Sequence, residues 1–539
     1  MVLVHLAECA AFLAGTLNDS LLNPFWQGLP GWLALFAIAL FFGNIPAKCI
    51  LTLLLVLQTA EAAVAIFLAL VFALPLCADA FGVLAVSSRE EIREFCRIFV
   101  SPVCVISVLL FIGAITALLT LLWKSTLEKS RYLYILAVLL LVPQVVNTVR
   151  YTLRKDYKKI YKANSVGRLV QSFRQYTEGT RHLEKMTKAP ELPQNIKAAH
   201  SEKMTFVWVL GESATRFHHS VYGYPRNTSP ELSKRRSELL VFDNVISGYA
   251  HTCQSCEYMF STQEYTNKKD FRFTLIDVFR QAGFKVTLLS NQYRWGRFDS
   301  PISFMTAHAH ERFYLQEVKA GAYDDMLYPE LCRVLEAGDQ PKLIILHLIG
   351  SHSTYESRFP ASAKVFNKDN RIKNIPYRVN KLQAIDDYDN SILFTDKLLG
   401  KVCEALSKRK EPAFMLYCSD HGDSPEEMKR KPRSGASTTE EHYEIPFVAY
   451  GNAAYRSKFS DLWTAAAKNV NRAFMTDWLM YPMFAAAGIS FDQFPDNKNL
   501  FSANYVPPAK RFLGNTGKQY KYRKNPYLQA ASVKKAPRK

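Results

Sequence analysis

The sequence predicts a helical membrane domain followed by a soluble α/β three-layer sandwich. Charged residues are sparse up to about residue 150 and frequent beyond it. In the second half, short runs rich in Val, Ile, Leu and Phe alternate with amphipathic helices, which is typical of an α/β sandwich. Several of these runs end in acids or imidazoles, where the carboxyl ends of parallel strands form ligand sites. A membrane anchor and a catalytic domain together account for the 539 residues.

The first 150 residues contain apolar runs close to the roughly 20 residues that a bilayer requires. Four of them are expected to cross the membrane, at residues 32–47, 51–76, 102–123 and 132–149. A fifth run, residues 4–17, is shorter and contains His5 and Glu8, so it forms either a fifth span or a surface helix. We therefore assign residues 1–150 to a transmembrane domain of about five spans.

Loop charge sets the orientation of this domain. Lys48 lies in one predicted hairpin and Lys124, Lys129 and Arg131 lie in another, so the positive-inside rule places both hairpins in the cytoplasm. The residues after 149 are then outside the cytoplasm, although the basic residues that follow the last span favour the opposite orientation. We expect residues 151–203 to form a helical connector that either lies on anionic headgroups or is solvated, because its first part alternates basic and apolar residues at helical spacing.

The net charge of +19 has a local source at the end of the chain, where the residues from Lys510 onward include ten Lys or Arg and no acid. No base-reading or stacking motif accompanies this basic tail, residues 506–539, so we expect no nucleic-acid partner, and either anionic lipid binding or disorder. The ten cysteines divide evenly between the two halves, so the five in the soluble half cannot all pair. Cys253 and Cys256 form a C-x-x-C that is oxidised, metal-bound or simply buried.

The catalytic domain is expected to cover residues 204–505. Its first buried strand begins at Met204 and leads to Glu212. The other predicted strands are residues 239–245, 284–290, 343–348, 414–418 and 445–450, and amphipathic helices are predicted at residues 274–282 and 381–406. This alternation of strands and helices implies three layers, with helices on both faces of a parallel sheet.

Candidate metal ligands follow the predicted strands. Glu212 lies in LGES, and Asp420 and His421 lie in SDHG, which together supply two oxygens and one nitrogen of the kind that zinc binds. Thr252, in HTCQSCEYMFST, is the candidate fourth ligand, because it opens a predicted helix whose N–H groups and dipole favour phosphate. Coordination to zinc would also lower the pKa of its hydroxyl. Each residue alone is a weak signal, but the four together indicate a metal site.

The order of these residues along the chain resembles that of the phosphoethanolamine transferases of the alkaline phosphatase superfamily. The matching stretches are LGESATRFHHSVYGYPRNTSPEL, HTCQSCEYMFST, LHLIGSHSTYESRFP, IDDYDNSILFTDKLL, CSDHGDSPEE and EHYEIPFVAYGN. The resemblance covers nearly the whole soluble half, and it covers the membrane half in the number of spans. It implies an α-helical transmembrane domain followed by an α/β three-layer sandwich of alkaline phosphatase type.

By position, the resemblance assigns the zinc set to Glu212, Thr252, Asp420 and His421. Thr252 would be the residue that becomes phosphorylated. His352 and His442 correspond to the family's histidines on the phosphate side, where they contact phosphate or hold a second zinc. Arg294 or Arg297, in NQYRWGRF, is the candidate for the family's phosphate-contacting lysine.

The resemblance implies a ping-pong reaction that moves phosphoethanolamine from phosphatidylethanolamine, through phospho-Thr252, to lipopolysaccharide or lipooligosaccharide. The disulfide that flanks the threonine in the lipid A enzymes has no counterpart, because Gly248 and Tyr258 occupy those places. The HYEIPF motif is similar to that of members acting on inner-core sugars, so we expect such an acceptor over lipid A phosphate. The resemblance also implies a bacterial inner-membrane protein with its catalytic domain in the periplasm, and we expect a monomer.

Three other functions share part of this sequence pattern. A phosphoglycerol transferase of envelope glycans shares the fold, the threonine and the spans, so it is the main alternative. A sulfatase is disfavoured because its nucleophile, Cys or Ser, is followed by Pro and Arg, whereas Cys253 is followed by Gln254 and Ser255. A catalytically silent membrane scaffold is disfavoured by the intact set of metal ligands.

Overall fold

The protein is described by a computed structural model. The described residues are 190–199, 203–268, 270–293, 301–372, 378–379, 382–425, 427–428, 439–514 and 517–528, with scattered residues between 45 and 181. The chain divides into two compact units, Met1–Arg181 with Lys431–Ser437, and His182–Arg430 with Thr438–Lys539.

In the first unit, every described residue is helical. Lys48 Nζ donates a hydrogen bond to the carbonyl of Trp123 (2.9 Å), and Trp123 Nε1 donates to Thr52 Oγ1 (3.1 Å). Most residues of the five predicted spans fall outside the described residues, and the described part is largest in the span 102–123. Among the residues that are described, no helix combines the length and the apolar character needed to cross a bilayer. The membrane assignment of residues 1–150 therefore stays a prediction.

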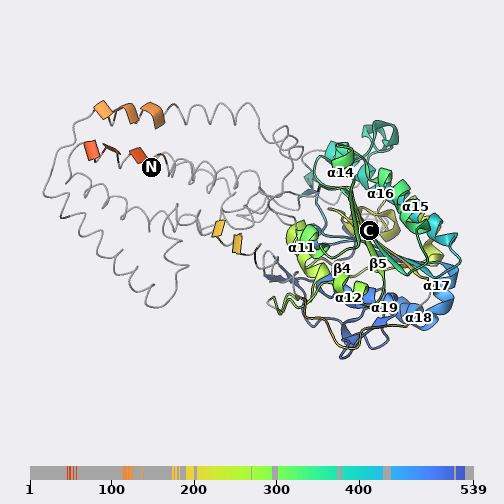
Figure 1. Ribbon diagram of the computed structural model, residues 1–539. Coiled ribbons are helices and arrows are strands. Elements are labelled where there is room, and N and C mark those ends of the chain that lie inside the picture. The colour runs from red at the N-terminus through yellow and green to blue at the C-terminus, as the bar shows by residue number, and fades with distance from the viewer. Residues whose placement is uncertain are drawn as a thin grey trace, which may run out of the picture. The chain divides into compact units, whose positions relative to one another are not determined.

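The second unit is built on one large sheet (Figure 1). Its strands are β2 (Thr205–Gly211), β3 (Leu239–Val241), β5 (Lys285–Ser290), β6 (Glu311–Tyr314), β7 (Lys342–His347), β9 (Ala413–Ser419) and β11 (Phe447–Gly451). The strand order is β3-β11-β9-β2-β7-β5-β6, with β2 in the middle and parallel to β7 and β9. All residues of β2 are buried, which explains its continuous apolar run, since both faces of a central parallel strand are covered.

Helices cover both faces of this sheet, which confirms the predicted three layers (Figure 1). The helices of these layers include α10 (Pro230–Lys234), α12 (Leu275–Gln281), α15 (Tyr328–Glu336), α16 (Leu382–Ser407) and α19 (Met480–Ala486). Neighbouring side chains of β2 point to opposite faces. Trp208 lies in a core with apolar residues of α12 and α19, whereas Val207 lies in a second core with residues of α15 and α16.

One strand departs from the predicted parallel sheet. β11 is antiparallel to both of its neighbours, β3 and β9. It begins beside the end of β9, where Phe447 pairs with Cys418, so the connection between these strands returns to the edge that it left. Because Asp420, His421 and His442 all lie on this connection, the antiparallel return keeps them at the carboxyl edge of the sheet. β6 was not predicted, because it is short and only Tyr314 is buried.

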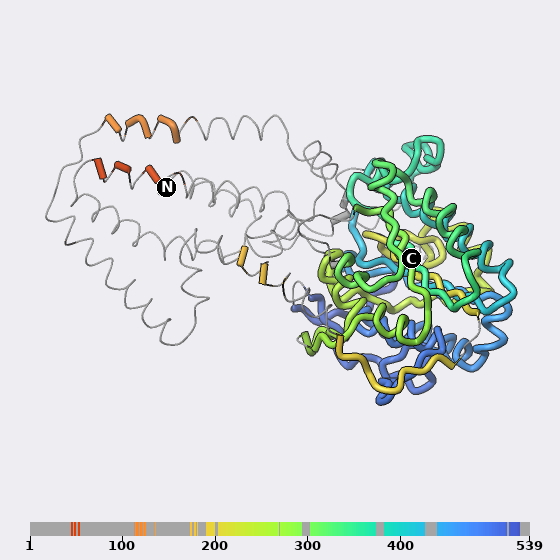
Figure 2. The backbone as a smooth tube through the Cα atoms, in the orientation of Figure 1, coloured from red at the N-terminus to blue at the C-terminus, as the bar shows by residue number. Residues whose placement is uncertain are grey.

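Residues on both sides of the predicted domain also pack against it. Residues 190–199, gold in Figure 2, run along the edge of the domain, where β1 (Lys197–Ala198) pairs with β13 (Ile489–Ser490). At the other end, residues 511–514 and 517–528 belong to the predicted basic tail. Tyr520 donates a hydrogen bond to the carboxylate of Glu444, and Asn525 Nδ2 donates to the carbonyl of Phe217 (3.2 Å). The folded unit thus includes residues beyond 204–505.

Candidate metal and phosphate site

The candidate site lies at the carboxyl ends of the central strands, where Glu212 directly follows β2. The Glu212 side chain is buried, and Ser213 Oγ donates a hydrogen bond to its Oε1 (2.7 Å). The backbone N–H of Ser351, in the loop after β7, donates to the Glu212 carbonyl (2.9 Å). Ser213 and the loop after β7 therefore hold Glu212 in place.

Asp420 and His421 reach the same place because β9 pairs with β2. Asp420 Oδ1 accepts hydrogen bonds from the backbone N–H groups of Ser213 (3.1 Å) and His421 (2.7 Å). Asp420 Oδ2 is buried and has no hydrogen-bond partner among the described residues. His421 Nδ1 lies 2.7 Å from the carbonyl of Gly422. A proton on Nδ1 satisfies that carbonyl and leaves Nε2 as an electron-pair donor for a metal.

Thr252 is the first residue of α11 (Thr252–Phe260), as predicted. Its Oγ1 lies 3.1 Å from Glu212 Oε2 and 3.3 Å from His421 Nε2. One ligand atom each from Glu212, Asp420 and His421 lie within 4.8 Å of one another. The structure therefore brings together all four side chains of the expected zinc set, from two strand ends and a helix start.

The electrostatics of this cluster suit a cation. Burial, followed by the charge of Glu212, raises the pKa of Asp420 to about 7. Burial alone would raise the pKa of Glu212, but the hydrogen bond and charge of His421 outweigh it and lower that pKa. Burial likewise opposes the charge on His421, but Asp420 and Glu212 raise its pKa to about 10. A divalent ion would replace the proton that these groups share, and two carboxylates, an imidazole and a hydroxyl fit tetrahedral zinc.

His442 is held beside the metal cluster by a second group of polar residues. Its Nε2 lies 3.3 Å from Asp423 Oδ1, and the hydroxyl of Tyr355 donates to Asp423 Oδ2 (2.6 Å). Burial would raise the pKa of Asp423, but the hydrogen bond and charge of His442 outweigh it and lower that pKa to about 2. The backbone N–H of Gly422 donates to the His442 carbonyl (2.7 Å). His442 is thus tied to the segment that carries the metal ligands.

Of the other residues predicted to contact phosphate, the structure describes His352 but neither of the two arginines. His352 directly follows Ser351, whose N–H donates to the Glu212 carbonyl, and the Nδ1 of His352 is buried without a hydrogen-bond partner among the described residues. Arg294 and Arg297 lie outside the described residues. Gln292, just before them, extends its Nε2 to 3.4 Å from Glu212 Oε2. The described part of NQYRWGRF therefore reaches the site.

Sequence reasoning missed three side chains that lie at this site: Gln292, Asp423 and His251. The ring of His251 lies 6.4 Å from the ring of His421. Burial, with the charges of His421 and His442, lowers the pKa of His251 to about 4. All three lie in the motif stretches given above, within two residues of a predicted site residue. Adjacency to a motif residue was therefore the one signal that the sequence offered for them.

Cys253 and Cys256 do not form a disulfide. Cys256 is fully buried in the core beneath α11, and burial raises the pKa of its thiol well above the usual value. The cluster of metal-ligating side chains found among the described residues contains neither cysteine. Of the three interpretations that the sequence left open, burial fits Cys256 best.

The fold and the cluster at its strand ends define an α/β catalytic domain of alkaline phosphatase type. The profile of the Sulfatase family matches residues 204–489, more than half of the chain, and the chain belongs to this family. Within the family it is similar to phosphoethanolamine transferases, which confirms the resemblance inferred from the motifs.

Two relatives illustrate this similarity. Phosphoethanolamine transferase EptC from Escherichia coli is 27% identical over 362 residues, which cover 63% of this chain and 60% of that protein. Phosphoethanolamine transferase EptA from Helicobacter pylori is 32% identical over 281 residues, which cover 50% of this chain and 51% of that protein. The chain therefore matches about half to three fifths of the length of these relatives.

Solved structures show the same fold. The C-terminal periplasmic domain of EptC from E. coli, in complex with Zn, has a TM-score of 0.56 and 26% identity, covering 61% of this chain and 95% of that one. The integral membrane protein lipooligosaccharide phosphoethanolamine transferase A from Neisseria meningitidis has a TM-score of 0.64 and 19% identity, covering 93% and 96%. The second likeness concerns the fold alone.

Proposed function

We propose that this protein transfers phosphoethanolamine from phosphatidylethanolamine to lipopolysaccharide or lipooligosaccharide, and that Thr252 carries the group between them. The observation that carries the proposal is the position of the Thr252 hydroxyl, at the start of α11 and within 3.3 Å of both Glu212 and His421. The names of the E. coli and H. pylori relatives support phosphoethanolamine as the transferred group.

Glu212, Asp420, His421 and Thr252 would hold one zinc ion. When bound, zinc would favour the ionised form of the Thr252 hydroxyl and offset charge on the phosphate. Asp420 Oδ2 has no hydrogen-bond partner among the described residues and lies 3.5 Å from His421 Nε2, which suits two ligands of one ion; the zinc complex of the E. coli domain also supports this assignment. His352 and His442 either contact the phosphate directly or hold a second ion.

In the first half-reaction, Thr252 Oγ1 attacks the phosphorus of phosphatidylethanolamine. The bond from phosphorus to the diacylglycerol oxygen breaks, and diacylglycerol leaves as an alcohol with one proton, while Thr252 gives up its own proton. The dipole and N–H groups at the start of α11 stabilise the phosphoryl charge. His352 or His442 would supply the proton to the leaving oxygen.

In the second half-reaction, an acceptor oxygen attacks phospho-Thr252. The bond between Thr252 Oγ1 and phosphorus breaks, Thr252 regains a proton, and His352 or His442 takes the proton of the acceptor. Asp423, held by the Tyr355 hydroxyl, fixes the ring of His442 for this transfer. The attacking and leaving alcohols use the same pocket in turn.

We propose an inner-core sugar as the acceptor in preference to lipid A phosphate. The HYEIPF motif supports this choice, and one relative, 26% identical over 274 residues, is named Kdo(2)-lipid A phosphoethanolamine 7''-transferase. Mass spectrometry of lipopolysaccharide from cells with and without the gene tests it. An added phosphoethanolamine on a core fragment supports the choice, and one found on lipid A would reverse it.

The proposed setting is the bacterial inner membrane, with residues 1–150 as the anchor, residues 151–203 as the interfacial connector, and a monomeric catalytic domain in the periplasm. The solved relative described as a C-terminal periplasmic domain supports the periplasmic placement of the catalytic domain. Tethering suits two lipid substrates, because it confines the site to the surface that presents them and raises their effective concentration.

Trapping the loaded enzyme tests the reaction. After incubation with phosphatidylethanolamine, peptide mapping of the full chain should find phosphoethanolamine on Thr252, and Thr252→Ala should lower turnover at least about a thousandfold. Thr306→Ala is the control, because Thr306 donates to the Ile302 carbonyl (2.7 Å) and does not touch the candidate site. Label from phosphatidylglycerol alone would favour the phosphoglycerol transferase. Full turnover by Thr252→Ala, or an adduct elsewhere, would refute the proposal.

A further inference from the structure

The loop that follows β2 has an unfavourable backbone conformation. Ser213, the residue after Glu212, has a φ of +56°. Residues other than glycine rarely adopt this left-handed conformation, because it brings the Cβ atom too close to the following carbonyl oxygen. Such a conformation persists only where the surrounding structure enforces it. The groups that hold Ser213 therefore determine where Glu212 lies.

Ser213 is held from both sides. Its N–H donates a hydrogen bond to Asp420 Oδ1 (3.1 Å). Its carbonyl accepts a hydrogen bond from the hydroxyl of Tyr388 (2.7 Å), and the same hydroxyl accepts one from the N–H of Thr215 (2.8 Å). One buried hydroxyl thus satisfies a backbone acceptor and a backbone donor on the two sides of Ala214. An unsatisfied backbone group at such a buried place would be costly.

Tyr388 comes from α16, which is itself fixed beneath the site. Asp389, the next residue of this helix, accepts hydrogen bonds from Arg226 NH1 (2.7 Å) and lies 2.7 Å from His218 Nδ1, and all three side chains are buried. Ser391 Oγ donates to Ser351 Oγ (2.8 Å), and Ser351 is the residue whose N–H holds the Glu212 carbonyl. The helix therefore presents Tyr388 from a rigid support.

The ring of Tyr388 also contacts the phosphate side of the site. It packs edge-to-face against the ring of Tyr355, with centroids 4.9 Å apart and an interplanar angle of 71°. The hydroxyl of Tyr355 in turn donates to Asp423, the partner of His442. Tyr388 therefore touches the Glu212 loop with its hydroxyl and the support of His442 with its ring.

We propose that Tyr388 is a positioning residue for Glu212, whose hydroxyl locks the strained loop 213–215 and thereby sets the metal affinity of the site. The inference deepens the proposed function and rests on it for the identity of the metal. Residues that orient metal ligands typically contribute 10–100-fold to metal affinity. Removing the Tyr388 hydroxyl should therefore weaken zinc binding roughly tenfold or more while leaving the ring in place.

The test compares Tyr388→Phe with Tyr455→Phe in the purified full chain. Tyr455 is an equally buried tyrosine whose hydroxyl donates to the Ala486 carbonyl (2.9 Å), and it makes no contact with the candidate site. Each variant loses one buried hydroxyl, so both should lose a few degrees of Tm. Zinc affinity is measured by competition with a chelator, and amide hydrogen exchange of residues 212–216 is measured in the metal-free protein.

Only Tyr388→Phe is expected to bind zinc roughly tenfold or more weakly and to exchange the Thr215 amide faster. Zinc affinity equal to that of Tyr455→Phe, or unchanged exchange of Thr215, would overturn the inference. If Tyr388→Phe does not fold, Ala214→Gly frees the same loop backbone and must weaken zinc binding in the same direction. Neither readout requires substrate, so failure of this inference is distinguishable from failure of the transfer reaction at Thr252.

Discussion

Replacing Gly350 with alanine should disable the site, because the added methyl group would collide with the backbone of Glu212. Gly350 has a φ of +49°, and a Cβ built there lies 2.7 Å from the Glu212 carbonyl oxygen and 2.9 Å from its nitrogen. Ordinary contact begins at 3.4 Å, so the two loops must separate by about 0.7 Å. The left-handed backbone adds roughly 1–2 kcal/mol of strain.

A separation of this size exceeds the roughly 0.5 Å within which a catalytic constellation must be held. We expect kcat/KM for phosphoethanolamine transfer to fall about a hundredfold. Gly283→Ala is the matched control, because Gly283 has a φ of +87° but no heavy atom within 4 Å of the added Cβ. The two variants share the backbone strain, and only Gly350→Ala adds the collision. Equal transfer rates for both would refute the reasoning that the backbone position of Glu212 governs the site.

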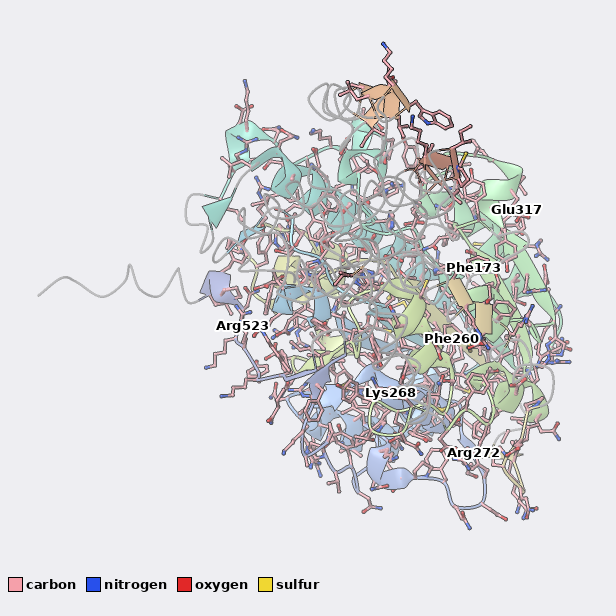
Figure 3. The ribbon with its side chains drawn as sticks, turned by 90° about the vertical axis from the view of Figure 1, so that its left-hand side faces the viewer. Phe173, Phe260, Lys268, Arg272, Glu317 and Arg523 are labelled. Carbon is pink, nitrogen blue, oxygen red and sulfur yellow. The ribbon has the colours of Figure 1, made fainter. Side chains whose placement is uncertain are left out.

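Two further substitutions test other parts of the domain. Asp396 accepts two hydrogen bonds from N–H groups at the start of α10, and burial raises its pKa from 3.8 to about 7. Because the folded pKa is the higher one, its stabilising contribution is complete below about pH 4 and is lost as the pH rises through 7. Asp396→Asn should thus gain stability relative to the parent over that interval, by at most about 1.4 kcal/mol per pH unit. A Tm difference that is constant from pH 4 to pH 8 would contradict this. Arg523, labelled in Figure 3, donates to Glu441 (3.1 Å), the neighbour of His442. Arg523→Ala should lower kcat roughly tenfold without changing zinc affinity, whereas Arg333→Ala, which removes two exposed ion pairs, should change neither. Loss of zinc from the first variant would show that Arg523 supports the metal ligands instead.

The metal ligands could be predicted because of where they stand in the sequence. A strand buried on both faces needs an unbroken apolar run, so the polar residue that ends the run is conspicuous. Glu212, Asp420 and His421 were found in this way, and Thr252 was found from the start of its helix. Parallel pairing of β2 with β9 then brings three of them together without further information.

The supporting residues could not be predicted in the same way. Tyr388 lies on a long helix among several buried residues, and nothing in IDDYDNSILFTD indicates which side chain meets the Glu212 loop. The antiparallel direction of β11 was also missed. An apolar run does not indicate the direction of its strand in the sheet, and the alternation of strands and helices suggested parallel strands. Both features depend on contacts between residues far apart in the chain.

The contacts of the buried Arg216 determine when the domain can finish folding during synthesis. Its guanidinium is fully buried and bonded to Glu444 (2.7 Å), and NH2 donates to the carbonyl of Arg523 (2.6 Å). A nascent chain lacks that last partner until more than three hundred residues after Arg216 have been made. The contacts of Arg216 with Glu444 and Arg523 should therefore form late, and fragments or fusions that end near residue 505 should fold poorly.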